Sequence, residues 1–157
     1  METSNSNMMR FLPAGLGIIA VVVALVAPWL AIDLSFGGET QSQSFTLREL
    51  IDEDVLVMRW FWISLVGVVL LIASAALAGE TGKNLAQAGA VLALVLPVRT
   101  LFDVFTEEEI AGASLGAGWG VWAFTVLAAL ALIASRFVPV EEQRDVQPLQ
   151  RIERVEQ

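Results

Sequence analysis

Long runs of apolar residues alternate with polar segments along this chain. Four such runs cover residues 11–32, 60–78, 85–105 and 111–138. A stretch of about 20 apolar residues is what an α-helix needs to cross the hydrocarbon core of a bilayer. The pattern therefore predicts an all-α membrane protein, a four-transmembrane-helix bundle. Its single membrane domain would cover residues 1–138, and a charged cytoplasmic tail would cover residues 139–157.

The polar segment 33–59, between the first two runs, carries signals for a small structure of its own. Apolar and polar residues alternate from Ile32 to Phe36, and the Gly37-Gly38 pair that follows is typical of a β-hairpin turn. Thr46-Leu47-Arg48-Glu49 fits a capping box, in which a hydroxyl precedes a carboxylate by three residues at the start of a helix. We therefore expect a strand-and-helix cap on the extracytoplasmic face.

The third run crosses a membrane only if its helix continues into charged sequence. Its predominantly apolar part, residues 85–98, is 14 residues long, so the helix must extend through Arg99 and Asp103 to about residue 105. Pro97 has no N–H and frees a backbone carbonyl, which Arg99 or a neighbouring hydroxyl could satisfy.

Arg99 and Asp103 are four residues apart and therefore share one face of that helix. Charged side chains at membrane depth are costly and usually find a partner. Two interpretations follow. The pair is either an interfacial salt bridge that completes a short span, or a polar site under the cap for a lipid headgroup or an ion.

The fourth run begins with glycines at four-residue spacing, Gly112, Gly116 and Gly120. Small residues at this spacing let two helices in lipid approach closely. We expect a helix-packing face here, used either within the bundle or against a second protein or a second copy of the chain.

Charge predicts the orientation of the spans. Four spans place both termini on one side, where six Lys and Arg residues lie, against three on the loop side. Cytoplasmic segments are enriched in Lys and Arg, so both termini are expected in the cytoplasm of a multi-pass plasma-membrane protein. Ten acidic residues lie on the loop side and seven on the terminal side, which gives net charges of −7 and −1. The candidate surface of the anionic external cap is Trp29, Asp52, Glu53, Asp54 and Trp62.

Composition narrows the chemistry. Hydrophobic residues make up 56% of the chain, with a mean hydropathy of +0.69, whereas soluble domains are about 45–50% apolar. The chain has no Cys and no His, which excludes disulfides, thiolate nucleophiles, histidine acid–base catalysis and Cys/His zinc sites. A formal charge of −8 disfavours nucleic acid as a partner. We expect neither a metal nor a cofactor.

The Pro28-Trp29 exit from the first run, the Gly37-Gly38 turn and the order of the spans carry a resemblance. They resemble small bacterial four-helix integral membrane proteins of unknown function, and the layout alone is similar to that of claudin-like proteins. Claudins have a Gly-Leu-Trp signature and a Cys pair in the first loop, and neither occurs here. The layout implies a recognition or assembly surface outside the membrane, without a barrier function.

Three classes of function compete. The carboxylates and hydroxyls are scattered, so no constellation for catalysis is evident, and we expect no enzyme. The interiors of the first, second and fourth runs lack ionisable residues. A small transporter or a lipid- or ion-binding protein would therefore have to use Arg99 and Asp103. The prediction is a structural, accessory or recognition subunit whose partners are membrane lipid and another membrane protein or itself.

Overall fold

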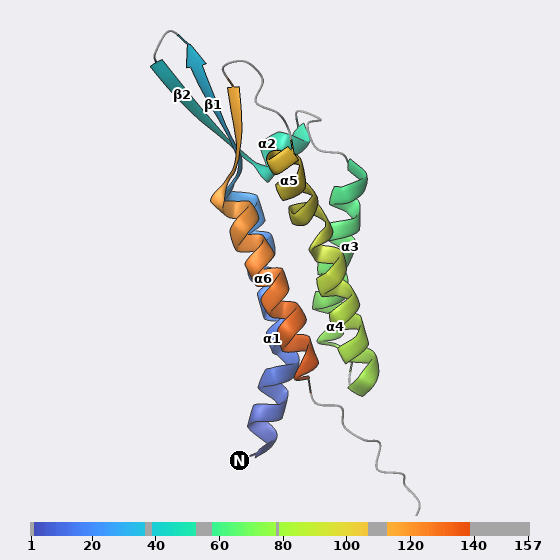
Figure 1. Cartoon of the computed structure of the whole chain (residues 1–157). Helices are drawn as coiled ribbons and strands as arrows, with labels where there is room; N and C mark the ends of the chain where they lie inside the picture. Colours follow the sequence, from blue (N-terminus) through green and yellow to red (C-terminus); the bar gives the residue numbers. More distant parts are fainter. Residues whose placement is uncertain (1, 37–38, 53–57, 78, 107–112, 139–157) are drawn as a thin grey trace, which may run out of the picture.

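The computed structural model of the chain describes residues 2–36, 39–52, 58–77, 79–106 and 113–138 (Figure 1). The helices are α1 (Glu2–Val26), α2 (Leu47–Asp52), α3 (Met58–Ser74), α4 (Gly79–Ala93), α5 (Val95–Thr106) and α6 (Trp119–Arg136). The strands are β1 (Pro28–Phe36), β2 (Glu39–Thr46) and β3 (Ala113–Ala117). The protein is mostly helical, with a three-stranded antiparallel sheet that extends beyond one end of the helices (Figure 1).

The helices pack as two pairs. α1 lies against α6 and α3 lies against α4, while α1–α3 and α4–α6 contacts join the pairs (Figure 1). α5 continues the direction of α4, so that residues 79–106 form one 28-residue apolar helix. Much of the core consists of alanine, which keeps the helix axes close. The larger buried side chains include Trp29, Leu71 and Phe124.

Glycine sets the distance between α3 and α4. A Cβ on Gly67 would overlap the backbone nitrogen of Ala93 and lie 2.7 Å from the carbonyl oxygen of Gly89. A Cβ on Gly89 would likewise lie 2.7 Å from the backbone oxygen of Gly67. The two backbones therefore touch directly, which is the contact that small residues permit between helices in lipid.

A hydroxyl on α3 replaces the backbone hydrogen bond that proline removes between α4 and α5. Pro97 cannot donate to the carbonyl of Ala93, four residues earlier. The Ser64 hydroxyl, which is buried, donates to that carbonyl at 2.5 Å. Of the two groups expected to satisfy the freed carbonyl, Arg99 or a hydroxyl, the structure shows the hydroxyl. The long helix continues past the proline to Thr106, as its short apolar part required.

The first run is not one helix from residue 11 to residue 32. α1 ends at Val26, and the chain enters β1 at Pro28. Proline removes a helical hydrogen bond and disfavours helical geometry at the preceding residue. β1 then has partners on both sides, because the strand order is β2-β1-β3. Pairing with β2 and β3 therefore holds in a strand residues that hydropathy alone assigned to a membrane helix.

The prediction of a helix-packing face at the start of the fourth run is also wrong. Gly116 belongs to β3, where it pairs with Ala31, and only Gly120 lies in α6. Gly112 lies outside the described residues. A Cβ on Gly120 would lie 2.7 Å from the carbonyl oxygen of Pro28, so this glycine packs against the end of β1. The glycine-rich segment forms a strand because β1 offers it a free edge, which spacing within the segment does not reveal.

Two local predictions for the cap are confirmed. β1 and β2 pair as an antiparallel hairpin from Phe36–Glu39 to Pro28–Thr46. The capping box forms at the start of α2: the backbone N–H of Thr46 donates to Glu49 Oε2 at 2.7 Å. The Thr46 hydroxyl donates to the same oxygen at 2.9 Å. Leu47 and Leu50 of α2 are buried, so the short helix lies with its apolar face on the bundle.

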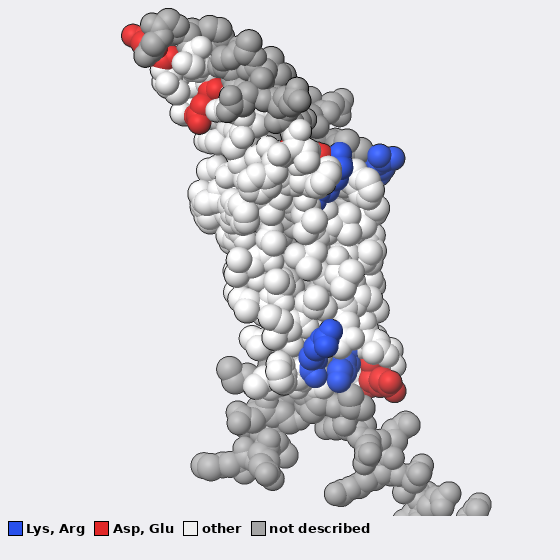
Figure 2. Space-filling view, viewed as in Figure 1, with Lys and Arg blue, Asp and Glu red and all other residues white. Residues whose placement is uncertain are grey.

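Two helices are long and apolar enough to cross a membrane: residues 79–106, with a mean hydropathy of 1.8, and Trp119–Arg136, with 1.5. Shorter apolar stretches lie in the other helix of each pair, Phe11–Val26 and Arg59–Ser74. On the face seen in Figure 2, a broad band without Lys, Arg, Asp or Glu covers the helices between charged ends. Large apolar side chains such as Val22, Val69 and Ile133 are exposed.

Candidate functional site

Trp29 anchors the sheet in the core between the helices. It is fully buried at the start of β1, and its ring packs edge-on against Phe124 of α6, with centroids 5.7 Å apart. Its Nε1–H donates to the Thr100 hydroxyl at 3.4 Å, and that hydroxyl donates to the Leu96 carbonyl at 3.0 Å. The assignment of Trp29 to the cap surface is therefore wrong, because the chain turns inward there instead of continuing as an exposed helix end.

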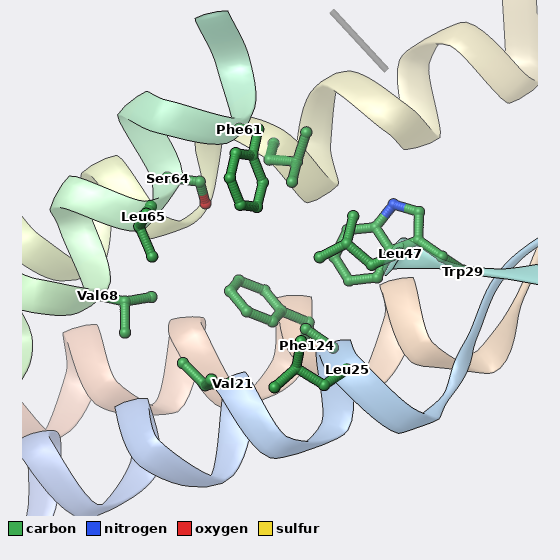
Figure 3. Close-up of a pocket in the computed structure, with 11 residues that line it drawn as sticks. Val21, Leu25, Trp29, Leu47, Phe61, Ser64, Leu65, Val68 and Phe124 are labelled. Atoms are coloured by element: carbon green, nitrogen blue, oxygen red, sulfur yellow. The ribbon is translucent and has the colours of Figure 1, made fainter. Parts of the chain in front are cut away.

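An apolar pocket of about 100 Å³ lies beside Trp29, beneath α2 and between the two helix pairs (Figure 3). Figure 3 shows Phe61 of α3 and Phe124 of α6 pointing into the same space, with Leu47 of α2 near Trp29. The other lining residues are Val21, Ala24, Leu25, Ser64, Leu65, Val68 and Leu96.

The chemistry of this pocket is purely apolar. Ser64 is the lining residue with a side-chain hydroxyl, and that hydroxyl is already bonded to the Ala93 carbonyl. An ordered water needs several polar partners, so the space suits an apolar group. Sequence reasoning missed the pocket because its walls come from six elements, and no local pattern links them.

Arg99 and Asp103 form the expected ion pair. Arg99 Nη2 lies 2.6 Å from Asp103 Oδ1, and both side chains are close to half exposed, at 46% and 41%. The guanidinium carbon of Arg99 also lies 5.4 Å from the ring centroid of Phe102. Neither charged residue lines the apolar pocket. The geometry is that of a partly exposed salt bridge near the end of a long helix.

Of the other predicted cap residues, the structure describes Trp62 and Asp52. Trp62 is exposed on α3 and packs edge-on against Phe61, with centroids 5.4 Å apart. Asp52 lies at the end of α2, where its carboxylate is 4.0 Å from Arg48 Nε. Glu53 and Asp54 lie outside the described residues. Of the three acids expected on the cap surface, the structure therefore describes one, Asp52. The two tryptophans occupy different environments, because Trp29 is buried and Trp62 is exposed.

Several charges near the tops of the helices have local partners. Arg59 lies over the ring of Trp60, with its guanidinium carbon 4.9 Å from the centroid. Hydrogen bonds from the Thr46 backbone and hydroxyl lower the pKa of Glu49 below its ordinary value of 4.5. On the sheet, the Ser42 hydroxyl donates to Asp33. Glu39 is exposed at the start of β2, so acidic character extends onto the projecting sheet (Figure 2).

Compared with protein-family models and with curated protein sequences, the chain matches none of them.

Proposed function

We propose that this chain is a non-enzymatic plasma-membrane protein with four spans and cytoplasmic termini, and that its projecting sheet recognises another membrane protein or a second copy of the chain. The observation that carries the proposal is the sheet itself. It extends past the helices, and β2 forms one of its edges (Figure 1). The pocket and the Arg99–Asp103 pair provide no set of groups for catalysis.

The edge of β2 is chemically suited to binding a protein. Within the described part of the chain, β2 pairs with β1 alone, so its other edge has backbone N–H and C=O groups without a strand partner there. The side chains of Glu39 to Ser44 are all exposed. Exposed strand edges are templates for strand addition by another chain, in which backbone hydrogen bonds give affinity and side chains give specificity.

The sheet is also held rigidly, which lowers the entropy lost on binding. β1 is the central strand, and its residues 30–34 are paired on both sides. Trp29 fixes the base of β1 in the core, and the Gly118 N–H donates to the Trp29 carbonyl at 3.0 Å, just before α6 begins. The orientation of the sheet is therefore coupled directly to α1 and α6.

The four-span arrangement is supported by the two long apolar helices, by the shorter apolar stretches that pack beside them, and by the uncharged band between charged ends. In water, so many exposed apolar side chains would form a large adhesive surface. In lipid they would contact acyl chains at no cost. The excess of Lys and Arg on the terminal side supports cytoplasmic termini.

Site-specific photo-crosslinking in cells tests recognition by the sheet. A photoreactive phenylalanine analogue replaces the exposed Gln43 on β2, and the matched control carries it at the exposed Val126 in the middle of α6. We expect a discrete protein adduct from position 43 only. The absence of an adduct at 43, or the same adduct from both positions, would count against recognition by the sheet.

Cysteine labelling tests the orientation independently. The chain contains no Cys, so Gln41→Cys and Gln147→Cys each introduce a unique thiol. With a membrane-impermeant maleimide on intact cells, we expect labelling at 41 and none at 147 until the cells are lysed. The opposite pattern would invert the topology and place the sheet in the cytoplasm.

A further inference from the structure

A second hollow lies at the opposite end of the helices from the sheet, between α4 and α6. It is an open groove of about 570 Å³. Its residues on α4, Asn84, Gln87, Ala88 and Val91, follow helical spacing along one face, and Leu92 lies beside them. Leu132 and Arg136, four residues apart, form the α6 side.

The groove changes from polar to apolar along its length. α4 starts and α6 finishes at the end away from the sheet (Figure 1). The groove residues nearest that end are Asn84, Gln87 and Arg136. One or two turns further into the bundle the walls become Val91, Leu92 and Leu132, so the groove has a hydrogen-bonding, cationic mouth and an apolar floor.

The polar side chains at the mouth have no side-chain partner within the part of the chain that the structure describes. Among the described residues, the side chains of Asn84, Gln87 and Arg136 make no hydrogen bond or ion pair with one another or with other side chains. Figure 2 shows basic side chains at this end, where the structure describes the side chains of Lys83 and Arg136. Among the side chains that the structure describes at this end, the acid is Glu80 in the first turn of α4, so one carboxylate stands against two basic groups there.

We propose that this groove binds an anionic glycerophospholipid. Its phosphate would take the charge of Arg136 and hydrogen bonds from the amides of Asn84 and Gln87, while an acyl chain would lie along Val91 and Leu132. Basic pockets between transmembrane helices on the cytoplasmic side are the usual binding places of anionic headgroups. The inference rests on the proposed membrane placement, and it is independent of any protein partner of the sheet.

Native mass spectrometry of the full chain in detergent tests the proposal. The delipidated protein is titrated with equal amounts of phosphatidylglycerol and phosphatidylcholine that carry identical acyl chains. We expect phosphatidylglycerol to be retained preferentially, and Arg136→Gln to weaken its binding roughly tenfold, the usual worth of a charge-assisted contact. Arg48→Gln is the matched control, because it removes the same charge from an exposed residue at the opposite end and should leave binding unchanged.

A second pair of variants separates a lipid from a soluble anion. Val91 and Val126 are similarly exposed, at 53% and 55%, but only Val91 lines the groove. Val91→Ser is expected to weaken phosphatidylglycerol binding several-fold and Val126→Ser to leave it unchanged. Soluble glycerophosphoglycerol at the same concentration should not displace the lipid. If the soluble ester displaces the lipid and Val91→Ser leaves phosphatidylglycerol binding unchanged, the groove is a site for a free phosphate ester and the lipid assignment is overturned.

Other outcomes also overturn the proposal. Equal retention of the two lipids by the wild type would show that the protein has no preference for the anionic headgroup. Equal loss of phosphatidylglycerol binding in the Arg136→Gln and Arg48→Gln variants would show that the lipid does not bind in the groove. If phosphatidylglycerol binds only after Glu141→Gln and Glu142→Gln substitutions, the acidic tail of the chain occupies the mouth instead. The crosslink at position 43 does not depend on Arg136, so failure of the lipid site and failure of recognition by the sheet are distinguishable.

Discussion

Two regions hold this protein together by opposite means. Where α3 meets α4, backbone touches backbone through Gly67 and Gly89. Where the sheet meets the helices, large side chains such as Trp29 and Phe124 fill most of the space and leave a pocket beside them. The first region has no room for a ligand and no tolerance for an added atom. The second depends on the area that its aromatic rings bury.

On the proposed membrane placement, the difference follows from what drives packing in lipid and in water. Between helices in lipid, burial of apolar surface contributes little, so close van der Waals contact between small residues must hold them together. At the junction with the sheet, β1 and α2 approach the helices from outside, and burying a tryptophan there removes a large apolar area from water. We therefore expect the two regions to respond differently to substitution.

Gly67→Leu is expected to have the largest effect. The new side chain would enter the backbone of α4 at Ala93, which cannot move aside as a side chain could. Overpacking of a core by extra methylenes costs about 1–3 kcal/mol, and a backbone collision should exceed that range. The measurement is the yield of monodisperse protein in detergent and its apparent Tm.

Gly15→Leu is the matched control for that prediction. Gly15 lies in α1, and a Cβ built on it meets nothing within 4 Å. We expect wild-type yield and Tm from this variant. A folded Gly67→Leu protein with an unchanged Tm would show that α3 and α4 do not depend on backbone contact.

Trp29→Ala is expected to destabilise the protein by about 3–5 kcal/mol, the usual cost of truncating a buried aromatic residue. The loss should fall on the junction, because Trp29 contacts Phe124 and Thr100 while α3 and α4 pack elsewhere. Hydrogen exchange should therefore rise in β1 and β3 before it rises in α4. Trp29→Phe keeps a ring but loses the N–H donor, and a smaller effect is expected. An equal rise in hydrogen exchange along the whole chain would contradict the conclusion that the two regions are stabilised independently.

Ser64→Ala tests the polar contact within the small-residue region. It removes the donor to the Ala93 carbonyl, which Pro97 cannot replace, and leaves a buried acceptor unsatisfied. The expected cost is about 1–3 kcal/mol, measured as a lower apparent Tm. The double variant Ser64→Ala/Pro97→Ala should recover most of the loss, because alanine at 97 restores the helical N–H donor. Additive losses would contradict this account.

The sequence predicted local features best. The pairing of β1 with β2 and the capping box at Thr46 depend on residues that lie close together in the sequence, and both are present. The helix also continues past Pro97, although the hydroxyl that satisfies the freed carbonyl comes from Ser64 on another helix. Hydropathy placed the helices but misjudged two ends. A strand with few charged residues, such as β1 or β3, has the same apolar content as the end of a membrane helix.

What the sequence did not predict depends on distant partners. β3 pairs with β1 across about 80 residues of chain, and Trp29 packs beside Phe124 because that pairing brings the two together. Trp29 therefore read as an interfacial residue when it is a core residue. The two hollows were missed for the same reason, since each is formed by helices that are adjacent only in space.

The smallest expected effect concerns the pH dependence of the junction, where the capping box positions α2 over the pocket. Hydrogen bonds from Thr46 lower the pKa of Glu49 in the folded state, so this carboxylate stabilises the fold above its ordinary pKa of 4.5 and loses that contribution as the pH falls through the folded value. The apparent Tm of the wild type should therefore exceed that of Glu49→Gln at neutral pH and converge with it below pH 4.5.

Thr46→Ala provides the control for the sign of this effect. It removes the hydroxyl that donates to Glu49 and, as loss of a helix N-cap, costs about 1 kcal/mol. Its backbone N–H still reaches the carboxylate, so part of the pH dependence should persist in this variant. A Tm difference between the wild type and Glu49→Gln that grows on acidification would mean that the protonated acid is the better partner. The capping box would then not be the source of the stability of α2.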